Sequence, residues 1–373
     1  MGENQTQTLW SIEDFKTQLN TTPKYRKALI VLTKNMAVKR YQFLRMVLNA
    51  LNDSDISTLI FDEFTGEITT QDLIKGADVA RDFECDLIIG IGGAKTLDAA
   101  KIIATLAKNP VEEPLFKKLK ALDSLSALDI FAVPTTIHLK SAYSKFALFV
   151  DPIQEEIHYL KNPVFTPKKT LILPEIIESL PPDILTLHTL EAYYTATEIY
   201  LLTGNHKDTV KNILNTIINT INVNDPKRIK TLLETSIQLS NIHHAITPLE
   251  AFERAFLLLH PDIPYGAAQS LCILSYYQKL SKNTLYTERL GDLASLIGVD
   301  VIGYDYPKQA ERFIEQIKEL LKAAQMSSIE LRSYGVDSAA ISDYVHYTLS
   351  ILNEKLPFSQ EDLYDMFEES LTN

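Results

Sequence analysis

The sequence is poor in cysteine, in long apolar runs and in positive charge, and each shortage argues against a class of protein. Its 373 residues include two cysteines, too few for a disulfide framework or a cysteine-based metal knuckle. We therefore expect a cytoplasmic chain. No apolar run approaches the ~18 residues that a membrane span requires. The formal net charge of −12 argues against binding to nucleic acid or to an anionic membrane surface.

The N-terminal stretch MGENQTQTLW is polar and lacks the apolar segment of a signal peptide. The stretch also matches the loose myristoylation pattern, with Gly2 and Thr6. We expect it instead to be a frayed terminus. No internal repeat or low-complexity segment is present to suggest a repeat or disordered architecture.

The first half of the chain alternates compact apolar runs with stretches of helical spacing. The expected strands are 25–32, 57–64, 86–93, 128–136 and 168–174, and the expected helices are 41–51, 69–83 and 96–109. Strands that alternate with helices predict a parallel, doubly wound sheet. Residues 141–150 and 155–162 interrupt this order and predict an antiparallel excursion.

A double proline in SLPPD (179–183) marks a boundary, and nearly everything after it has helical period. The predicted fold is therefore α/β plus all-α. A doubly wound, mainly parallel nucleotide-binding domain (1–180) is followed by an all-helical domain (181–373). Ligand sites in such folds favour the carboxyl ends of the strands and the cleft between domains.

The segment DLIIGIGGAKTLDAAKIIA (86–104) places glycines directly after a strand and before a helix. Without side chains at Gly90, Gly92 and Gly93, the backbone can turn tightly and let a phosphate approach the free N–H groups of the helix. Lys95 adds positive charge and Thr96 a hydroxyl. The segment is neither the dinucleotide fingerprint nor the P-loop. The alternative interpretation is a tight turn that binds nothing.

The same segment resembles the Gly-Gly-Gly-Lys/Ser-x-x-Asp-x-x-Lys motif of the superfamily of glycerol dehydrogenase and iron-containing alcohol dehydrogenase, which includes dehydroquinate synthase. It departs from that motif at Ala94, where the third glycine usually stands. Other segments resemble the superfamily in the same order along nearly the whole chain: FTGEITTQDL (64–73), FAVPTT (131–136), SLPPDILTLHTLEAYYTATE (179–198), IPYGAAQSL (263–271) and LRSYGVDSAAISDYV (331–345).

The resemblance implies NAD or NADP as cofactor, with its pyrophosphate at the glycine turn. The positions implied for cofactor binding are Gly92, Gly93, Ala94, Lys95, Thr96, Asp98, Thr135, Thr136, Ser144 and Lys161. For Lys161 a solvated surface charge is the alternative. Relatives that prefer NAD often carry an acidic residue after the first strand. This chain has Thr33-Lys34-Asn35 there, which would tolerate or favour NADP.

Relatives also use a divalent metal, zinc or iron, to polarise the substrate hydroxyl, held by one Asp and two His. The resemblance places His188 at the Asp position and Tyr265 at one His position. The other His position falls on Arg254, or on His260 if the preceding loop is shortened. An Asp near the substrate of glycerol dehydrogenases corresponds to Lys140.

Two alternatives therefore stay open for the metal. Either a site is rebuilt from His188, His260 and Asp262, or the metal is lost. Lys140 and Arg254 would repel a dication, and a tyrosine hydroxyl is a poor zinc ligand at neutral pH. The same positive charges suit an anionic ligand such as a phosphate or carboxylate.

Two functions follow from the sequence. The first is an NAD(P)-dependent oxidoreductase acting on a small polyol, alcohol or anionic hydroxy-compound. Its candidate catalytic residues are His188, Tyr265, Lys140 and Arg254. The second is a degenerate relative that binds nucleotide without turnover. By analogy with relatives we also expect a homo-oligomer.

Overall fold

The computed structural model divides the chain into two compact units. The first holds the residues up to Leu180 and the last turns of helix α10 (Pro226–Ile242), from Ser236 on, and the second holds the rest. The structure describes residues 6–21, 25–34, 38–64, 68–111, 117, 119, 124–220, 226–242, 245–264, 266–324, 334–352 and 357–372.

The first unit is built on one parallel sheet of six strands in the order β1–β8–β5–β4–β2–β3. The strands are β1 (Gln7–Leu9), β2 (Lys27–Val31), β3 (Ser57–Phe61), β4 (Leu87–Gly92), β5 (Asp129–Pro134) and β8 (Lys169–Leu171). Strand β4 lies in the interior of the sheet, and all six of its residues are buried. This sheet, together with the helical remainder of the chain, confirms the predicted fold class.

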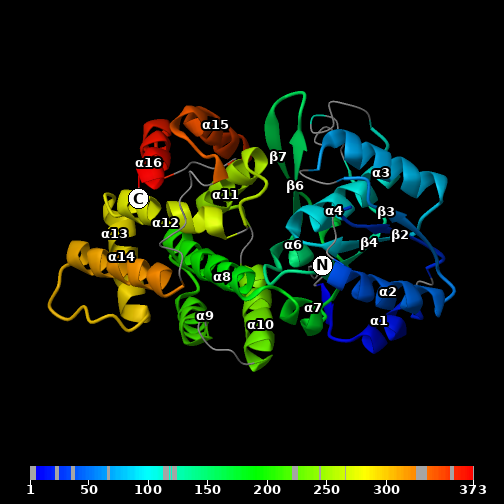
Figure 1. The fold of residues 1–373 in the computed structure, drawn as a ribbon, viewed down its shortest axis with the longest axis horizontal. Coiled ribbons are helices and arrows are strands. Elements are labelled where there is room, and N and C mark those ends of the chain that lie inside the picture. The colour runs from blue at the N-terminus through cyan, green and yellow to red at the C-terminus, as the bar shows by residue number, and fades with distance from the viewer. Residues whose placement is uncertain are drawn as a thin grey trace. The chain divides into compact units, whose positions relative to one another are not determined.

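Two layers of helix cover the sheet (Figure 1). Helices α1 (Ile12–Leu19) and α2 (Val38–Asn52) pack on one face, and α3 (Thr70–Asp82) and α4 (Ala94–Lys108) on the other. Helix α3 begins with a capping box, in which Thr69 and Asp72 bond each other's backbone N–H groups. Because both faces are covered, the inner strands β2, β4 and β5 are buried along nearly their whole length and read as continuous apolar runs.

The N-terminal stretch is more ordered than we expected. Residues Gln7–Leu9 form the edge strand β1, which pairs in parallel with β8. The Thr6 hydroxyl donates to the carbonyl of Pro167 at 2.7 Å. The expectation that this stretch frays was therefore wrong for its described part. Its partner lies about 160 residues away along the chain, so no local pattern could reveal the pairing.

The predicted antiparallel excursion is confirmed as a hairpin of β6 (Phe146–Asp151) and β7 (Glu156–Lys161). Asp151 Oδ1 accepts the N–H groups of Ile153 and Gln154 and so closes the turn. The hairpin is flanked by the short helices α6 (Lys140–Tyr143), η1 (Pro163–Phe165) and α7 (Pro174–Glu178).

The second unit is helical throughout its described part, as predicted. Its elements are α8 (Pro182–Thr203), α9 (Lys207–Thr220), the first turns of α10, α11 (Pro248–Leu259), α12 (Ala267–Leu280), α13 (Thr284–Leu296), α14 (Tyr306–Ala323), η3 (Ser338–Ala340), α15 (Ile341–Ile351) and α16 (Gln360–Thr372). Pro182 and Pro248 each stand in a helix's first turn, where the missing N–H costs nothing.

Aromatic rings dominate the core of the second unit. Phe252 and Phe256 of α11 pack against Phe367 of α16, and Phe256 also meets Tyr344 of α15 with ring centroids 4.5 Å apart. Tyr276 of α12 closes the cluster against Phe252. Edge-to-face and tilted contacts of this kind add to the stabilisation that burial provides.

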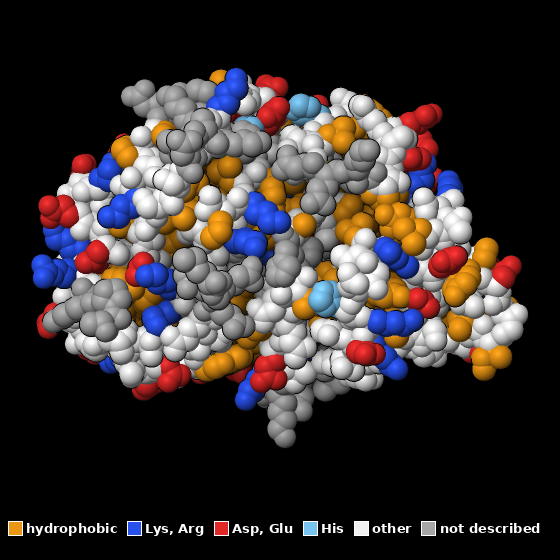
Figure 2. All heavy atoms as spheres, turned by 180° about the vertical axis from the view of Figure 1, so that it is seen from behind, with side chains coloured by type: hydrophobic (Ala, Val, Ile, Leu, Met, Phe, Trp, Pro, Cys, Tyr) orange, Lys and Arg blue, Asp and Glu red, His pale blue; other side chains and the backbone are white. Residues whose placement is uncertain are grey.

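On the face drawn in Figure 2, acidic and basic side chains are interspersed among apolar and uncharged ones. The net charge of −12 is therefore not gathered into one acidic region there. None of the described helices is both long enough and apolar enough to cross a membrane.

Candidate functional site

The glycine turn joins the buried strand β4 to helix α4, and two of its glycines are required by packing. A Cβ atom on Gly90 would lie 2.9 Å from Cβ of Ala100. A Cβ atom on Gly92 would lie 2.5 Å from the hydroxyl oxygen of Thr96. These two positions bring the helix close to the strand, so their glycines need no ligand to explain them.

Gly93, the N-cap of α4, is different. Its φ of −80° is open to any residue, and a Cβ atom there would come no closer than 3.6 Å to Thr136 Cγ2. Glycine at this position leaves the helix without a side-chain cap, so the first-turn N–H groups depend on water or a ligand. The fold does not need this glycine, whereas a phosphate approaching the backbone would.

Thr135 and Thr136 follow β5, directly beside this turn. The Thr135 N–H donates to the carbonyl of Gly92 at 3.0 Å. The buried Thr135 hydroxyl has no hydrogen-bond partner among the described residues. A buried hydroxyl without a partner is costly, and a ligand oxygen at the turn would satisfy it. Lys95, in the first turn of α4, is half-buried.

Asp98 and Ser144, two predicted cofactor positions, instead share a buried lysine. The Lys101 ammonium donates to Asp98 Oδ1 at 3.2 Å and to Ser144 Oγ at 3.1 Å. Burial lowers the pKa of Lys101, and the Asp98 carboxylate opposes that shift. The second Asp98 oxygen accepts the N–H of Leu148. The Asp98 carboxylate therefore links helix α4 to the β6–β7 hairpin.

Lys140 and Lys161 lie in contrasting surroundings. Lys140 opens α6 and is 5% exposed, with its ammonium 4.9 Å from the ring centre of Phe146. A cation over an aromatic face is attracted by the ring quadrupole. Lys161 ends β7 and is exposed, which agrees with the alternative of a solvated charge.

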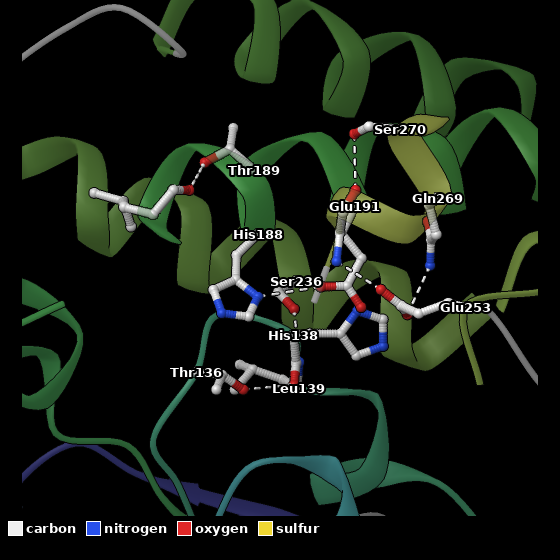
Figure 3. A network of polar contacts seen from close by, with 12 residues as sticks. Thr136, His138, Leu139, His188, Thr189, Glu191, Ser236, Glu253, Gln269 and Ser270 are labelled. Atoms are coloured by element: carbon white, nitrogen blue, oxygen red, sulfur yellow. Dashed lines mark hydrogen bonds and ion pairs between the residues drawn. The ribbon is translucent and has the colours of Figure 1, made fainter. Parts of the chain in front are cut away.

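In the second unit, His188 is buried on α8 and paired with Glu191 one turn later. Figure 3 shows the imidazole turned toward the carboxylate, with Nδ1 3.2 Å from Glu191 Oε2. Arg254, on α11, is half-buried. Tyr265 lies outside the described residues.

His260 forms the C-cap of α11, and its Nε2 lies 2.6 Å from the hydroxyl of Tyr344. Burial and the nearby Asp337 and Asp343 raise the pKa of Tyr344 above its usual range. The tyrosine therefore stays protonated and is a standing hydrogen-bond partner for the imidazole.

Comparison with known proteins finds one matching family model and several similar chains. The family model for iron-containing alcohol dehydrogenase matches residues 9–174. An NADPH-dependent butanol dehydrogenase of Clostridium saccharobutylicum is 27% identical over 329 residues, which cover 84% of this chain and 81% of the relative. The chain therefore resembles iron-containing alcohol dehydrogenases, by the family model over residues 9–174 and by this relative over most of its length.

Solved structures of alcohol dehydrogenases share the fold of this chain. An archaeal halo-thermophilic alcohol dehydrogenase from a Red Sea brine pool superposes with a TM-score of 0.83 at 19% identity, covering 100% of this chain and 99% of that chain. Some curated relatives match over less of their own length. The bifunctional aldehyde-alcohol dehydrogenase of Escherichia coli K12 is 25% identical over 190 residues, which cover 48% of this chain and 21% of the relative.

The candidate metal ligands among the described residues do not gather into one site. One nitrogen of His188 faces Glu191, and one nitrogen of His260 faces Tyr344. In the described part of the chain, no group of three or more His, Cys, Asp or Glu side chains is placed to hold a metal ion. His188, His260 and Asp262 therefore do not form the rebuilt site that we considered.

Three buried glutamates of the second unit were not singled out from the sequence. Glu253 accepts the Gly266 N–H at 2.6 Å. It also accepts the Gln269 amide at 3.0 Å, a contact drawn in Figure 3. Glu198 is fully buried, and burial raises its pKa to about 8. Glu191 orients His188. In the sequence, each of the three is a glutamate among apolar neighbours in a helical segment. The same pattern is common on half-exposed helix faces, so it does not single out buried glutamates.

Proposed function

We propose that this protein is an NAD(P)-dependent oxidoreductase that interconverts a small alcohol and its carbonyl compound. The observation that carries the proposal is Gly93. It is a glycine that neither packing nor backbone conformation requires, at the N-terminus of a helix without a side-chain cap. The similarity to iron-containing alcohol dehydrogenases supports the class of reaction.

The cofactor would lie with its pyrophosphate at the glycine turn. The N–H groups of Ala94, Lys95 and Thr96, in the first turn of α4, would face the phosphate oxygens, and the helix dipole would favour their charge. The Thr135 hydroxyl would gain a partner there. When bound, the nicotinamide supplies or accepts the hydride.

We further propose that NADP is preferred over NAD. Lys34 is exposed just after β2, and its N–H donates to the carbonyl of Phe64 at 3.0 Å, which fixes the backbone there. A lysine at this place can pair with a 2′-phosphate, whereas an acidic residue would repel it. The butanol dehydrogenase relative is itself named as NADPH-dependent. Asn35 lies outside the described residues.

On the substrate side, the proposed candidates are Lys140, Tyr265, His188 and Arg254. Alcohol oxidation releases a proton that a side chain must accept, and carbonyl reduction consumes one. Lys140 is the candidate best supported by position, since its helix packs against the first turn of α4 through Ala142 and Leu97. Its positive charge would also favour an anionic hydroxy-compound among the candidate substrates.

The test is a fluorescence titration of NADPH and NADH with the wild type, Gly93→Ala and Ala94→Gly. A methyl group on Gly93 has room in the fold but would occupy the phosphate's approach. We expect Gly93→Ala to weaken NADPH binding about tenfold, or ~1.4 kcal/mol, with an unchanged melting temperature. Ala94→Gly, which restores the superfamily's glycine, should bind at least as tightly as the wild type. A wild type that binds neither nucleotide refutes the proposal.

A second function, nucleotide binding without turnover, is favoured by the lack of a fitting metal cluster among the described residues. Initial rates with NADPH and butanal, and with NADP and butanol, separate the two functions. Saturable binding with no measurable rate for any small aldehyde or alcohol would support the second. Elemental analysis of untagged protein would show alongside whether zinc or iron is present.

A further inference from the structure

Helix α6 is too short to hold itself in place, because a single turn of helix is not stable alone. The helix and its N-cap Leu139 are instead tied to distant segments. The Leu139 N–H donates to Ser236 Oγ of α10 at 3.1 Å, a contact visible in Figure 3. Thr170 of β8 donates to the carbonyl of Ala142 at 2.8 Å. The Tyr143 hydroxyl lies 2.8 Å from that of Thr8.

The C-terminal end of α6 is held by Lys101 of α4. The side chain of Lys101 is 0% exposed. Its ammonium donates to Ser144 Oγ, the C-cap of α6, at 3.1 Å and to the carbonyl of Phe146 at 2.8 Å. The Asp98 carboxylate balances its charge. A buried ion pair with this many bonds fixes geometry more than it adds stability.

Phe146 links the two lysines. Its ring centre lies 5.8 Å from the Lys101 ammonium and 4.9 Å from the Lys140 ammonium. The Lys101 bond to its carbonyl fixes the backbone from which the ring projects. The ring also packs against Tyr159, with centroids 5.3 Å apart. Any movement of Phe146 would therefore move the surface on which Lys140 lies.

We propose that Lys101 is a positioning residue for Lys140, acting through the Phe146 ring and the C-cap of α6. Ala142 of α6 packs with Leu97 of α4 and Ala132 of β5. This packing holds α6, and Lys140 with it, against α4, the helix that follows the glycine turn. The Lys101 side chain is enclosed by protein, so its effect on a substrate would pass through its protein neighbours. The proposal rests on the proposed function insofar as Lys140 acts on the substrate.

The variant Phe146→Leu removes the shared ring and keeps an apolar side chain. Phe149→Leu is its matched control, because Phe149 is buried on the same strand and its ring packs against His158 instead. We expect Phe146→Leu to lower kcat/KM for butanal reduction at least tenfold, while the Kd for NADPH stays within twofold. Phe149→Leu should stay within threefold in both. Equal losses in the two variants overturn the proposal.

The double variant Asp98→Asn/Lys101→Met tests Lys101 itself. Both charges leave together, so no unpaired charge is buried. We expect the same separation, with kcat/KM lowered at least tenfold and NADPH affinity retained. An unchanged kcat/KM overturns the proposal.

A readout without turnover keeps this proposal distinct from the proposed function. Acetylation of Lys140 by N-hydroxysuccinimidyl acetate, followed by mass spectrometry, reports how firmly its ammonium is held. We expect labelling at least fivefold faster in Phe146→Leu than in Phe149→Leu, even if the wild type reduces no aldehyde. Equal labelling rates refute the positioning role, whereas absent NADPH binding in the wild type refutes the proposed function alone.

Discussion

The buried carboxyl group of Glu198 should make the second unit less stable as the pH rises. Glu198 is a residue of α8, and its side chain is fully buried. Its Oε1 accepts the N–H of Leu249 at 3.1 Å. Burial is the main cause that raises its pKa to about 8, and the neighbouring Glu250 adds to it. The hydrogen bond from the Leu249 N–H opposes the shift without cancelling it.

The sign follows from proton binding. Between the ordinary glutamate pKa and about 8, the folded chain keeps the proton on Glu198 and the unfolded chain releases it. The stability that the raised pKa contributes is complete below the ordinary value and is lost as the pH rises toward 8. The loss is about 1.4 kcal/mol per pH unit, or roughly 5 kcal/mol over the whole window.

Glu198→Gln provides the measurement, since glutamine resembles the protonated acid and does not titrate. Guanidinium unfolding, followed by circular dichroism at several pH values from 5 to 8.5, gives the free energy of unfolding for both proteins. We expect the variant to equal the wild type near pH 5 and to exceed it by several kcal/mol near pH 8. Parallel curves for the two proteins across this range would refute the reasoning.

Three other outcomes are expected. Gly92→Ala should lower the free energy of unfolding by about 1–3 kcal/mol, because its Cβ would lie 2.5 Å from the Thr96 hydroxyl; denaturant unfolding at constant m-value checks this. Thr69→Ala should cost about 1 kcal/mol through loss of the α3 capping box, and a variant as stable as the wild type would contradict it. Lys34→Asp should move the ratio of NADPH to NADH affinity at least tenfold toward NADH, as measured by titration with both nucleotides.

The central part of the first unit could be predicted because its signals are local. An apolar run followed by glycines and a helical pattern suffices to place β4, the turn and α4. Helix α4 nevertheless begins at Ala94, two residues before the predicted start at Thr96. Strand β1 was missed because three residues paired with β8 carry no periodicity of their own.

The candidate site shows the same limit. Glycines between a strand and a helix indicate a phosphate-binding turn, so Gly92 and Gly93 could be singled out from the sequence. Nothing in the spacing distinguishes Gly92, which packing requires, from Gly93, which it does not. The environment of Lys101 depends on residues more than 40 positions away, so its role could not be read from the chain.

The course of α10 has a consequence for cutting the chain into parts. Thr235 belongs to the second unit, whereas Ser236, the next residue of the same helix, belongs to the first. A fragment ending at Leu180 would lack Ser236 Oγ, the acceptor for the buried N–H of Leu139. The first unit is thus completed by the end of α10. A fragment meant to fold as the first unit must therefore include the residues from Ser236 on.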